Sequence, residues 1–193
     1  MIIVEGPDGA GKTTLIKRLM EEYPQLEVMP RAVSKEAKSL TQIDDYIEAE
    51  LNKGFGLRLY DRFALLSSPC YAMLPNRTFA GRMFDPHWLR AMHYRLLALD
   101  PVVIVCLPSL ATVVNNVREG RDNLVVQNDI ETIYINYLNY FASQVNNTSV
   151  MLWDYNYPEP SRLKTLMQWA LGRIDYEQHG EERRRQKWKT NLD

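Results

Sequence analysis

The sequence predicts an α/β protein in which a five-stranded parallel sheet lies between two layers of helices. Short β-branched runs alternate along the chain with segments whose apolar residues recur at helical spacing, as expected of parallel strands joined by helices. The run from Val102 to Leu107 is apolar at every position, which is typical of a parallel strand covered on both faces. The chain has 193 residues, of which 46% are hydrophobic and 24% charged, and this composition indicates one globular domain.

The first half of the chain contains three predicted strands and two predicted helices. Pro24 stops the first helix, and Gly54 and Gly56 lie where the second one ends. The predicted elements are, in order, a strand over 2–4, a helix over 15–23, a weaker strand over 26–29, a helix over 43–51 and a strand over 57–60. The third strand ends at Asp61 and Arg62.

The second half opens with a helix-start signal, because Asp85 can cap a helix and Pro86 suits its first turn. Pro101 ends this helix, and Ser109 is placed to cap another one. The predicted elements are a helix over 88–99, a strand over 102–107, a helix over 113–117, a polar connection over 118–127, a helix over 130–141, a strand over 150–153 and a helix over 163–171.

Charge and cysteine content exclude several classes of protein. Lys and Arg number 23 against 24 Asp and Glu, so no global field attracts nucleic acid or an anionic membrane, and local geometry must hold any bound anion. The two cysteines, Cys70 and Cys106, provide neither a disulfide framework nor a zinc cluster, which favours a reducing compartment. No apolar run is long enough to span a bilayer and the first residues lack signal-peptide features, so we expect a cytoplasmic protein with no membrane partner.

A phosphate-binding motif lies between the first predicted strand and the first predicted helix. It reads Gly6-Pro7-Asp8-Gly9-Ala10-Gly11-Lys12-Thr13 and fits G-x-x-x-x-G-K-[ST], with Thr14 directly after it. Glycines let backbone N–H groups converge on phosphate oxygens, and the start of the helix adds its positive dipole end. Lys12 is placed to reach the β and γ phosphates, and Thr13 to hold Mg²⁺.

Two charged residues follow the third predicted strand. Asp61 and Arg62 stand at the carboxyl end of a parallel strand, where ligand crevices form in α/β proteins. Asp61 is a candidate for holding the metal or its water, and Arg62 for binding a second phosphate. A salt bridge at the surface is the alternative interpretation of this pair.

The sequence resembles the thymidylate kinase family of P-loop nucleoside monophosphate kinases. The stretch Ile3 to Thr14 is very similar to the opening of that family, and Asp61-Arg62-Phe63 looks like its Asp-Arg-aromatic signature. The resemblance implies a three-layer P-loop NTPase fold with a short lid, ATP as phosphoryl donor, Mg²⁺, and a deoxynucleoside monophosphate acceptor. It also implies that Arg62 binds the acceptor phosphate and that Asp8 accepts a hydrogen bond from the sugar 3′-hydroxyl.

The family places a catalytic arginine either in the P-loop or in the lid. This P-loop carries Gly9 and Ala10 and no arginine, so the role falls to Arg118 or Arg121. We therefore expect a kinase domain over residues 1–175 with its lid at about 118–128, followed by a charged tail over 176–193.

The predicted acceptor pocket departs from the family pattern. Tyr71, with Phe63, is a candidate for binding the acceptor base, although Tyr71 stands one residue out of register with the family pattern. Arg31, which follows the second predicted strand, is a further candidate for the acceptor site, although the Glu-Pro-Gly residues common around this arginine in the family are absent. The stretch 75–82 has no counterpart in the family pattern. These departures leave the identity of the acceptor base open.

The sequence therefore favours a kinase that transfers the γ-phosphoryl group of ATP to dTMP or a related pyrimidine deoxynucleoside monophosphate. A deoxynucleoside kinase, with Asp61 as general base, is the nearest alternative. Another alternative is a kinase of a modified base in DNA, which would contact the DNA through the basic residues between Arg183 and Lys189. A GTPase switch is disfavoured, because this sequence lacks the Asn-Lys-x-Asp segment with which GTPases recognise the base. We expect small-molecule nucleotides as partners rather than nucleic acid, and the family resemblance leaves a homodimer open.

Two other groups of residues carry no predicted chemistry. The three histidines His87, His93 and His179 show no ligand spacing, so no metal site is drawn from them. An aromatic stripe at helical spacing is predicted to be core rather than a base-stacking surface; its members are Tyr134, Tyr137, Tyr140 and Phe141.

Overall fold

Five parallel strands form one sheet in the order β2-β3-β1-β4-β5. The computed structural model describes residues 1–30, 40–72, 85–120, 124–142 and 149–172. The elements are β1 (Ile2–Glu5), α1 (Lys12–Glu22), β2 (Glu27–Met29), α2 (Leu40–Asn52), β3 (Arg58–Asp61), α3 (Ala64–Ala72), α4 (Pro86–Ala98), β4 (Val102–Cys106), α5 (Leu110–Glu119), α6 (Leu124–Ala142) and β5 (Val150–Trp153), followed by a helix over 160–172.

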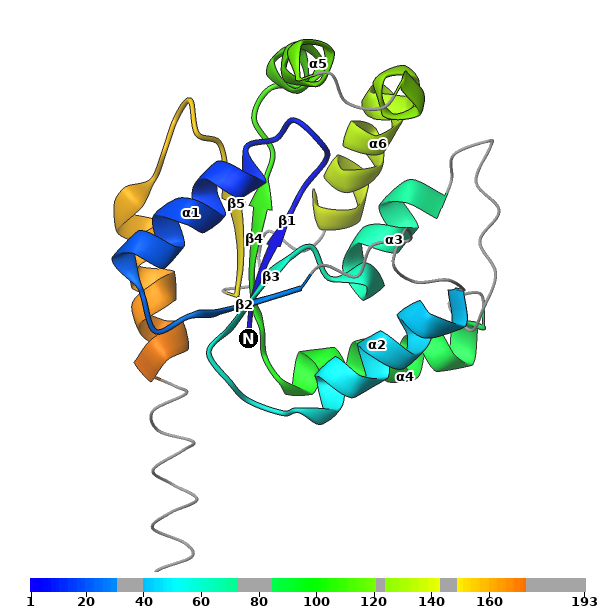
Figure 1. Cartoon of the computed structure of the whole chain (residues 1–193), viewed down its shortest axis with the longest axis vertical. Helices are drawn as coiled ribbons and strands as arrows, with labels where there is room; N and C mark the ends of the chain where they lie inside the picture. Colours follow the sequence, from blue (N-terminus) through cyan, green and yellow to red (C-terminus); the bar gives the residue numbers. More distant parts are fainter. Residues whose placement is uncertain (31–39, 73–84, 121–123, 143–148, 173–193) are drawn as a thin grey trace, which may run out of the picture.

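Helices cover both faces of this sheet (Figure 1). Alternate residues of β1 serve the two faces: Ile3 packs in a cluster with residues of α2, α3, α4 and α6, whereas Ile2 and Val4 pack with residues of α1, α5 and the helix over 160–172. Every residue of β1 and β4 is buried. This arrangement confirms the predicted three-layer α/β fold with a five-stranded parallel sheet.

Most predicted elements and helix caps are confirmed. The Asp85 side chain accepts a hydrogen bond from the His87 N–H at the start of α4. The Ser109 side chain does the same for the Thr112 N–H at the start of α5. Tyr137 and Phe141 of the aromatic stripe are buried in the core, as predicted.

One prediction about local structure is wrong, and one helix was missed. The polar connection predicted over 118–127 is largely helical, because α5 continues to Glu119 and α6 begins at Leu124. Helix α3 was not predicted, because Pro69 lies inside it and removes one N–H donor from the helix. Among the described residues no helix is long and apolar enough to cross a membrane.

Gly6 allows the loop after β1 to pass against the end of β4. Its φ is 137°, and a Cβ built there would lie 2.4 Å from the Cys106 carbonyl oxygen. That separation is far inside a van der Waals contact, and the backbone atom cannot rotate away. The start of the phosphate-binding loop is therefore fixed by contact with the sheet itself.

We expect Gly6→Ala to lower the free energy of unfolding by at least ~1–3 kcal/mol, because it adds backbone strain and a clash with Cys106. Thermal or urea unfolding measures the change. Gly172→Ala is the matched control, since a Cβ there meets no atom within 4 Å. Equal stability of the two variants would contradict the close packing of the loop on β4.

Candidate functional site

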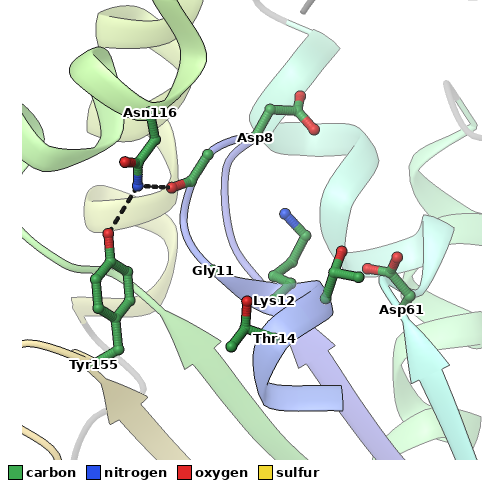
Figure 2. Close-up of a pocket in the computed structure, with 9 residues that line it drawn as sticks. Asp8, Gly11, Lys12, Thr14, Asp61, Asn116 and Tyr155 are labelled. Carbon is green, nitrogen blue, oxygen red and sulfur yellow. Dashed lines mark hydrogen bonds between the residues drawn. The ribbon is translucent and has the colours of Figure 1, made fainter. Parts of the chain in front are cut away.

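A pocket lies where β1 and β3 end, around the predicted phosphate-binding loop (Figure 2). Its volume is about 590 Å³. The lining residues come from the loop and α1, from the end of β3, from α5 and from the segment after β5; they are Asp8, Gly9, Gly11, Lys12, Thr13, Thr14, Asp61, Asn116 and Tyr155. The sequence motif and the strand-end aspartate therefore meet in one pocket.

The loop has the conformation that a phosphate cradle needs. Gly9 and Gly11 have φ values of 73° and 81°, in the left-handed region, and α1 begins at Lys12 with its first N–H groups at the pocket. The Lys12 Nζ donates a hydrogen bond of 2.6 Å to the Pro7 carbonyl, which holds the ammonium over the loop. Pro7 itself and Ala10 are buried and shape the loop from behind.

Burial lowers the pKa of Lys12 to about 7, and the nearby positive charge of Arg62 acts in the same direction. Asp8 and Asp61 oppose this shift by favouring the charged ammonium. An anionic ligand in the pocket would raise the lysine pKa again. The two neighbouring cations Lys12 and Arg62 therefore favour the binding of an anionic group in this site.

Asn116 and Tyr155 extend the pocket beyond the predicted residues. The Asn116 amide nitrogen donates to the Gly9 carbonyl at 2.8 Å and to the Tyr155 hydroxyl at 2.7 Å. Figure 2 marks the hydrogen bond between Asn116 and Tyr155. The Tyr155 ring lies against Gly11, where an added Cβ would meet it at 2.9 Å. Nothing in the sequence pairs these positions, because the three segments are far apart in the chain.

Asp61 carries an unsatisfied acceptor in this pocket. Its Oδ1 is buried and accepts no hydrogen bond from the described residues, while Thr13 lines the same pocket with its side chain exposed. Among the described residues no three His, Cys, Asp or Glu side chains converge on a metal position. Mg²⁺ needs no such cluster, because it is usually held by one or two protein oxygens together with phosphates and water. The Thr13 and Asp61 oxygens fit that donor set.

Arg62 is turned toward the loop by an unusual backbone conformation. Its φ of 65° lies in the left-handed region, and its N–H donates to the Val4 carbonyl at 2.9 Å. The residue is 8% exposed, and its Nε donates to the Gly6 carbonyl at 3.1 Å while Nη2 donates to Asp8 Oδ1 at 2.7 Å. Its Nη1 donates to none of the described residues. One edge of the guanidinium is thus not used by the described residues, although Arg62 itself is not among the residues that line the pocket.

Asp8 joins this arginine to an aromatic side chain. Its second oxygen accepts a hydrogen bond of 3.0 Å from the Tyr71 hydroxyl, and the Tyr71 ring stacks under the Arg62 guanidinium at 5.1 Å. Burial would raise the pKa of Asp8, but the charges of Arg62 and Lys12 outweigh it and lower the pKa below its ordinary value. Asp8, Arg62 and Tyr71, predicted separately, therefore form one cluster.

Glu5 lies beneath this cluster and was not predicted. It is fully buried at the end of β1, and its Oε1 accepts the Phe63 N–H at 2.7 Å while Oε2 accepts the Tyr137 hydroxyl at 3.1 Å. Burial raises the pKa of Glu5 to about 7, although the hydrogen bond from Phe63 and the charge of Arg62 oppose the shift. The sequence feature that could have indicated its role is an acidic residue at the carboxyl end of an otherwise apolar strand.

Phe63 and Arg118, also predicted, are not among the residues that line the pocket. The Phe63 side chain is fully buried and packs edge-on against Tyr60, and its backbone N–H donates to the buried Glu5 carboxyl group. Arg118 is exposed in the last turn of α5. Arg31 and Arg121 lie outside the described residues.

Comparison with known proteins gives information at the level of the fold. The chain matches no protein-family model and no curated protein. The YorR protein from Bacillus subtilis, in complex with phosphorylated GDP, superposes with a TM-score of 0.65 at 18% identity, over 92% of this chain and 97% of that chain.

Deoxyadenosine kinase from M. mycoides has a similar structure. With bound dATP it gives a TM-score of 0.52 at 16% identity, over 86% of this chain and 97% of that chain. With the products dCMP and a flexible dCDP the TM-score is 0.54 at 15% identity, over 89% and 98% of the two chains. These likenesses, with the sheet order and the glycine loop, show that this chain has the three-layer P-loop NTPase fold found in P-loop kinases.

Glu5 should make stability depend on pH in a defined direction. Its folded pKa of about 7 lies above the ordinary value of 4.5, so the unfolded chain releases this proton first as pH rises. We expect the free energy of unfolding of the wild type, relative to Glu5→Gln, to be highest below about pH 4.5 and to fall by up to ~3 kcal/mol toward pH 7. Urea unfolding of both proteins at several pH values measures this difference, and a difference that does not vary with pH would refute it.

Proposed function

We propose that this protein is a kinase that transfers the γ-phosphoryl group of ATP to a deoxynucleoside monophosphate, with dTMP or a related pyrimidine nucleotide as the favoured acceptor. The observation that carries the proposal is the buried Arg62, whose guanidinium is held by Asp8 beside the P-loop with one edge unused. A fixed arginine fork is suited to a phosphate that stays bound while a second phosphoryl group is delivered to it.

The donor side of the pocket supports this assignment. Backbone N–H groups of the loop from Gly6 to Thr13 would bind the donor phosphates, Lys12 would reach the β and γ phosphates, and Thr14 would contribute from the lining of the same pocket. Thr13 and Asp61 would hold Mg²⁺, which when bound neutralises charge on the donor phosphates. Structures with this fold contain nucleotides, among them the deoxyadenosine kinase with dATP.

The acceptor side is assigned to the cluster around Asp8. Arg62 would hold the acceptor phosphate, and the Asp8 carboxylate, with its lowered pKa, is charged at neutral pH and suited to accept a sugar hydroxyl. Tyr71 fixes Asp8 from the other side, and Arg31 completes the proposed acceptor residues. The acceptor phosphate is already an anionic nucleophile, so positioning and charge neutralisation suffice for the reaction.

A deoxynucleoside kinase is the second candidate, and Asp61 favours it. A neutral 5′-hydroxyl acceptor needs a general base. Asp61 lines the pocket, and its buried Oδ1 is free of hydrogen bonds from the described residues. The fold likeness to deoxyadenosine kinase is compatible with either acceptor.

Arg118 and Arg121 are proposed to supply positive charge to the transferring phosphoryl group from a lid at about 118–128. Arg118, at the exposed end of α5, is two residues beyond Asn116, which contacts the loop carbonyl of Gly9. This lid belongs to a proposed kinase domain over residues 1–175, with the charged segment 176–193 as a tail.

Removing the cations that are proposed to meet the phosphates should lower kcat. We expect Lys12→Ala to reduce it by ~10²–10³-fold, and the Arg118→Ala/Arg121→Ala double variant to reduce it more than it raises either KM. Steady-state ADP release with ATP and Mg²⁺ gives both constants. Lys17→Ala, an exposed lysine on the same helix, is the control that should retain full activity. Full activity of a folded Lys12→Ala protein would rule out the donor assignment.

The acceptor class is decided by comparing each deoxynucleoside with its own 5′-monophosphate. We expect the higher kcat/KM for the monophosphate, and we expect Arg62→Lys to raise the acceptor KM strongly while the KM for ATP changes little, because lysine cannot form the two-pronged phosphate contact. The panel includes dTMP, the other deoxynucleoside monophosphates, the nucleosides and duplex DNA.

Arg18→Lys is the control for this substitution, since Arg18 is exposed and pairs only with Glu22 on α1. A higher kcat/KM for the nucleosides would replace the proposal with a deoxynucleoside kinase in which Asp61 is the general base. Phosphorylation of DNA alone would overturn both.

A further inference from the structure

The left-handed conformation of Arg62 has to be held by its surroundings. A residue other than glycine with φ near 65° is strained by ~1–3 kcal/mol and persists only where neighbouring groups determine it. Three consecutive residues at the end of β1 contact this segment. Val4 accepts the Arg62 N–H, Glu5 accepts the Phe63 N–H, and Gly6 accepts the Arg62 Nε–H.

Glu5 differs from the other two because it acts with its side chain. Val4 and Gly6 offer backbone carbonyls, which any residue supplies, whereas the Glu5 carboxyl group reaches Phe63 at 2.7 Å, the shortest of the three contacts. This position in the strand therefore requires a side-chain acceptor of the length of glutamate.

Helix α6 in turn holds the Glu5 side chain. The Tyr137 hydroxyl donates to Glu5 Oε2, and the Tyr137 ring stands edge-on to the Tyr71 ring, with centroids 6.1 Å apart at 87°. Tyr71 donates to Asp8, which binds Arg62. The contacts thus form a closed circuit from Glu5 through the Phe63–Arg62 backbone, Asp8, Tyr71 and Tyr137 back to Glu5, which we name the Glu5 circuit.

Glu5 does not reach a ligand itself, since it is fully buried and its two carboxylate oxygens accept hydrogen bonds from Phe63 and Tyr137. We propose that Glu5 is a positioning residue of the acceptor site: its carboxyl group, held by Tyr137, fixes the Arg62–Phe63 backbone so that the Arg62 guanidinium faces the acceptor phosphate. This inference rests on the proposed role of Arg62 in binding that phosphate. Tyr137 contributes by orienting Glu5 and by supporting the ring of Tyr71.

The test replaces Glu5 by methionine, which is similar in length and offers no strong acceptor to the Phe63 N–H. We expect Glu5→Met to raise the acceptor KM by ~10–100-fold, because the guanidinium is displaced, with little change in the KM for ATP. Glu5→Gln keeps an amide oxygen for Phe63 and should recover most of the loss. Tyr137→Phe should give a smaller rise than Glu5→Met.

Glu50 offers a matched control. It is also a buried glutamate, 4% exposed, whose carboxylate accepts a tyrosine hydroxyl, from Tyr60, and pairs with a buried arginine, Arg58. Arg58 begins β3, whereas Asp61 ends it, so this group lies away from the pocket. Glu50→Met should lower stability while leaving the acceptor KM at its wild-type value.

A measurement independent of turnover separates this inference from the proposed function. The ¹⁵N and ¹H shifts of the Arg62 Nε–H group report its hydrogen bond to Gly6 in the free protein. We expect them to change in Glu5→Met, or in Tyr137→Phe if the methionine variant does not fold, and to stay close to the wild-type values in Glu5→Gln and Glu50→Met. Unchanged Arg62 shifts in folded Glu5→Met, or in folded Tyr137→Phe where the methionine variant does not fold, overturn the inference. If the wild type phosphorylates no monophosphate but these shifts do change, the proposed function fails and the positioning of Arg62 by Glu5 stands.

Discussion

The arrangement of this site depends on burying the Arg62 guanidinium close to Lys12. Two positive charges in a dehydrated environment repel each other, and Arg62 accordingly helps to lower the pKa of Lys12. Asp8, which is partly buried, compensates on the loop side through a 2.7 Å ion pair, and removing it would leave the buried guanidinium without its charged partner. The phosphate loop and the end of β3 therefore cannot be arranged independently, because each supplies the charge that the other requires.

Much of the fold could be predicted from the sequence because its determinants are local. Buried parallel strands appear as short apolar runs, and β4 is apolar and buried at every position. Asp85 and Ser109 mark the helix starts because a side-chain oxygen can bind an N–H group of the first turn. Helix α3 escaped prediction because Pro69 is a helix breaker by propensity, and packing of Leu65 and Cys70 in the core overrides that propensity.

The candidate site could be predicted only in part, for the same reason. The phosphate loop is a contiguous motif, so its residues are recognisable together. The contacts that arrange its surroundings join residues far apart in the chain, such as Glu5 with Tyr137 and Asn116 with Tyr155. No local pattern encodes such pairs. Sequence reasoning identified Asp8, Arg62 and Tyr71 one by one, but it gave no indication that Asp8 is the acceptor shared by the other two.

The backbone at Arg62 explains how neighbouring residues of opposite charge serve one crevice. Successive side chains of a regular strand point to opposite faces of the sheet, so Asp61 and Arg62 in extended conformation would be separated by the backbone. The left-handed turn at Arg62 ends that alternation: Asp61 lines the pocket beside Thr13, and Arg62 reaches Gly6 and Asp8. A strained residue at the end of β3 is thus what allows one short segment to present a carboxylate and a guanidinium to the same loop. The strain is balanced by the hydrogen bonds from this segment to the end of β1, which is why a buried acceptor at that strand end matters for the geometry of the crevice.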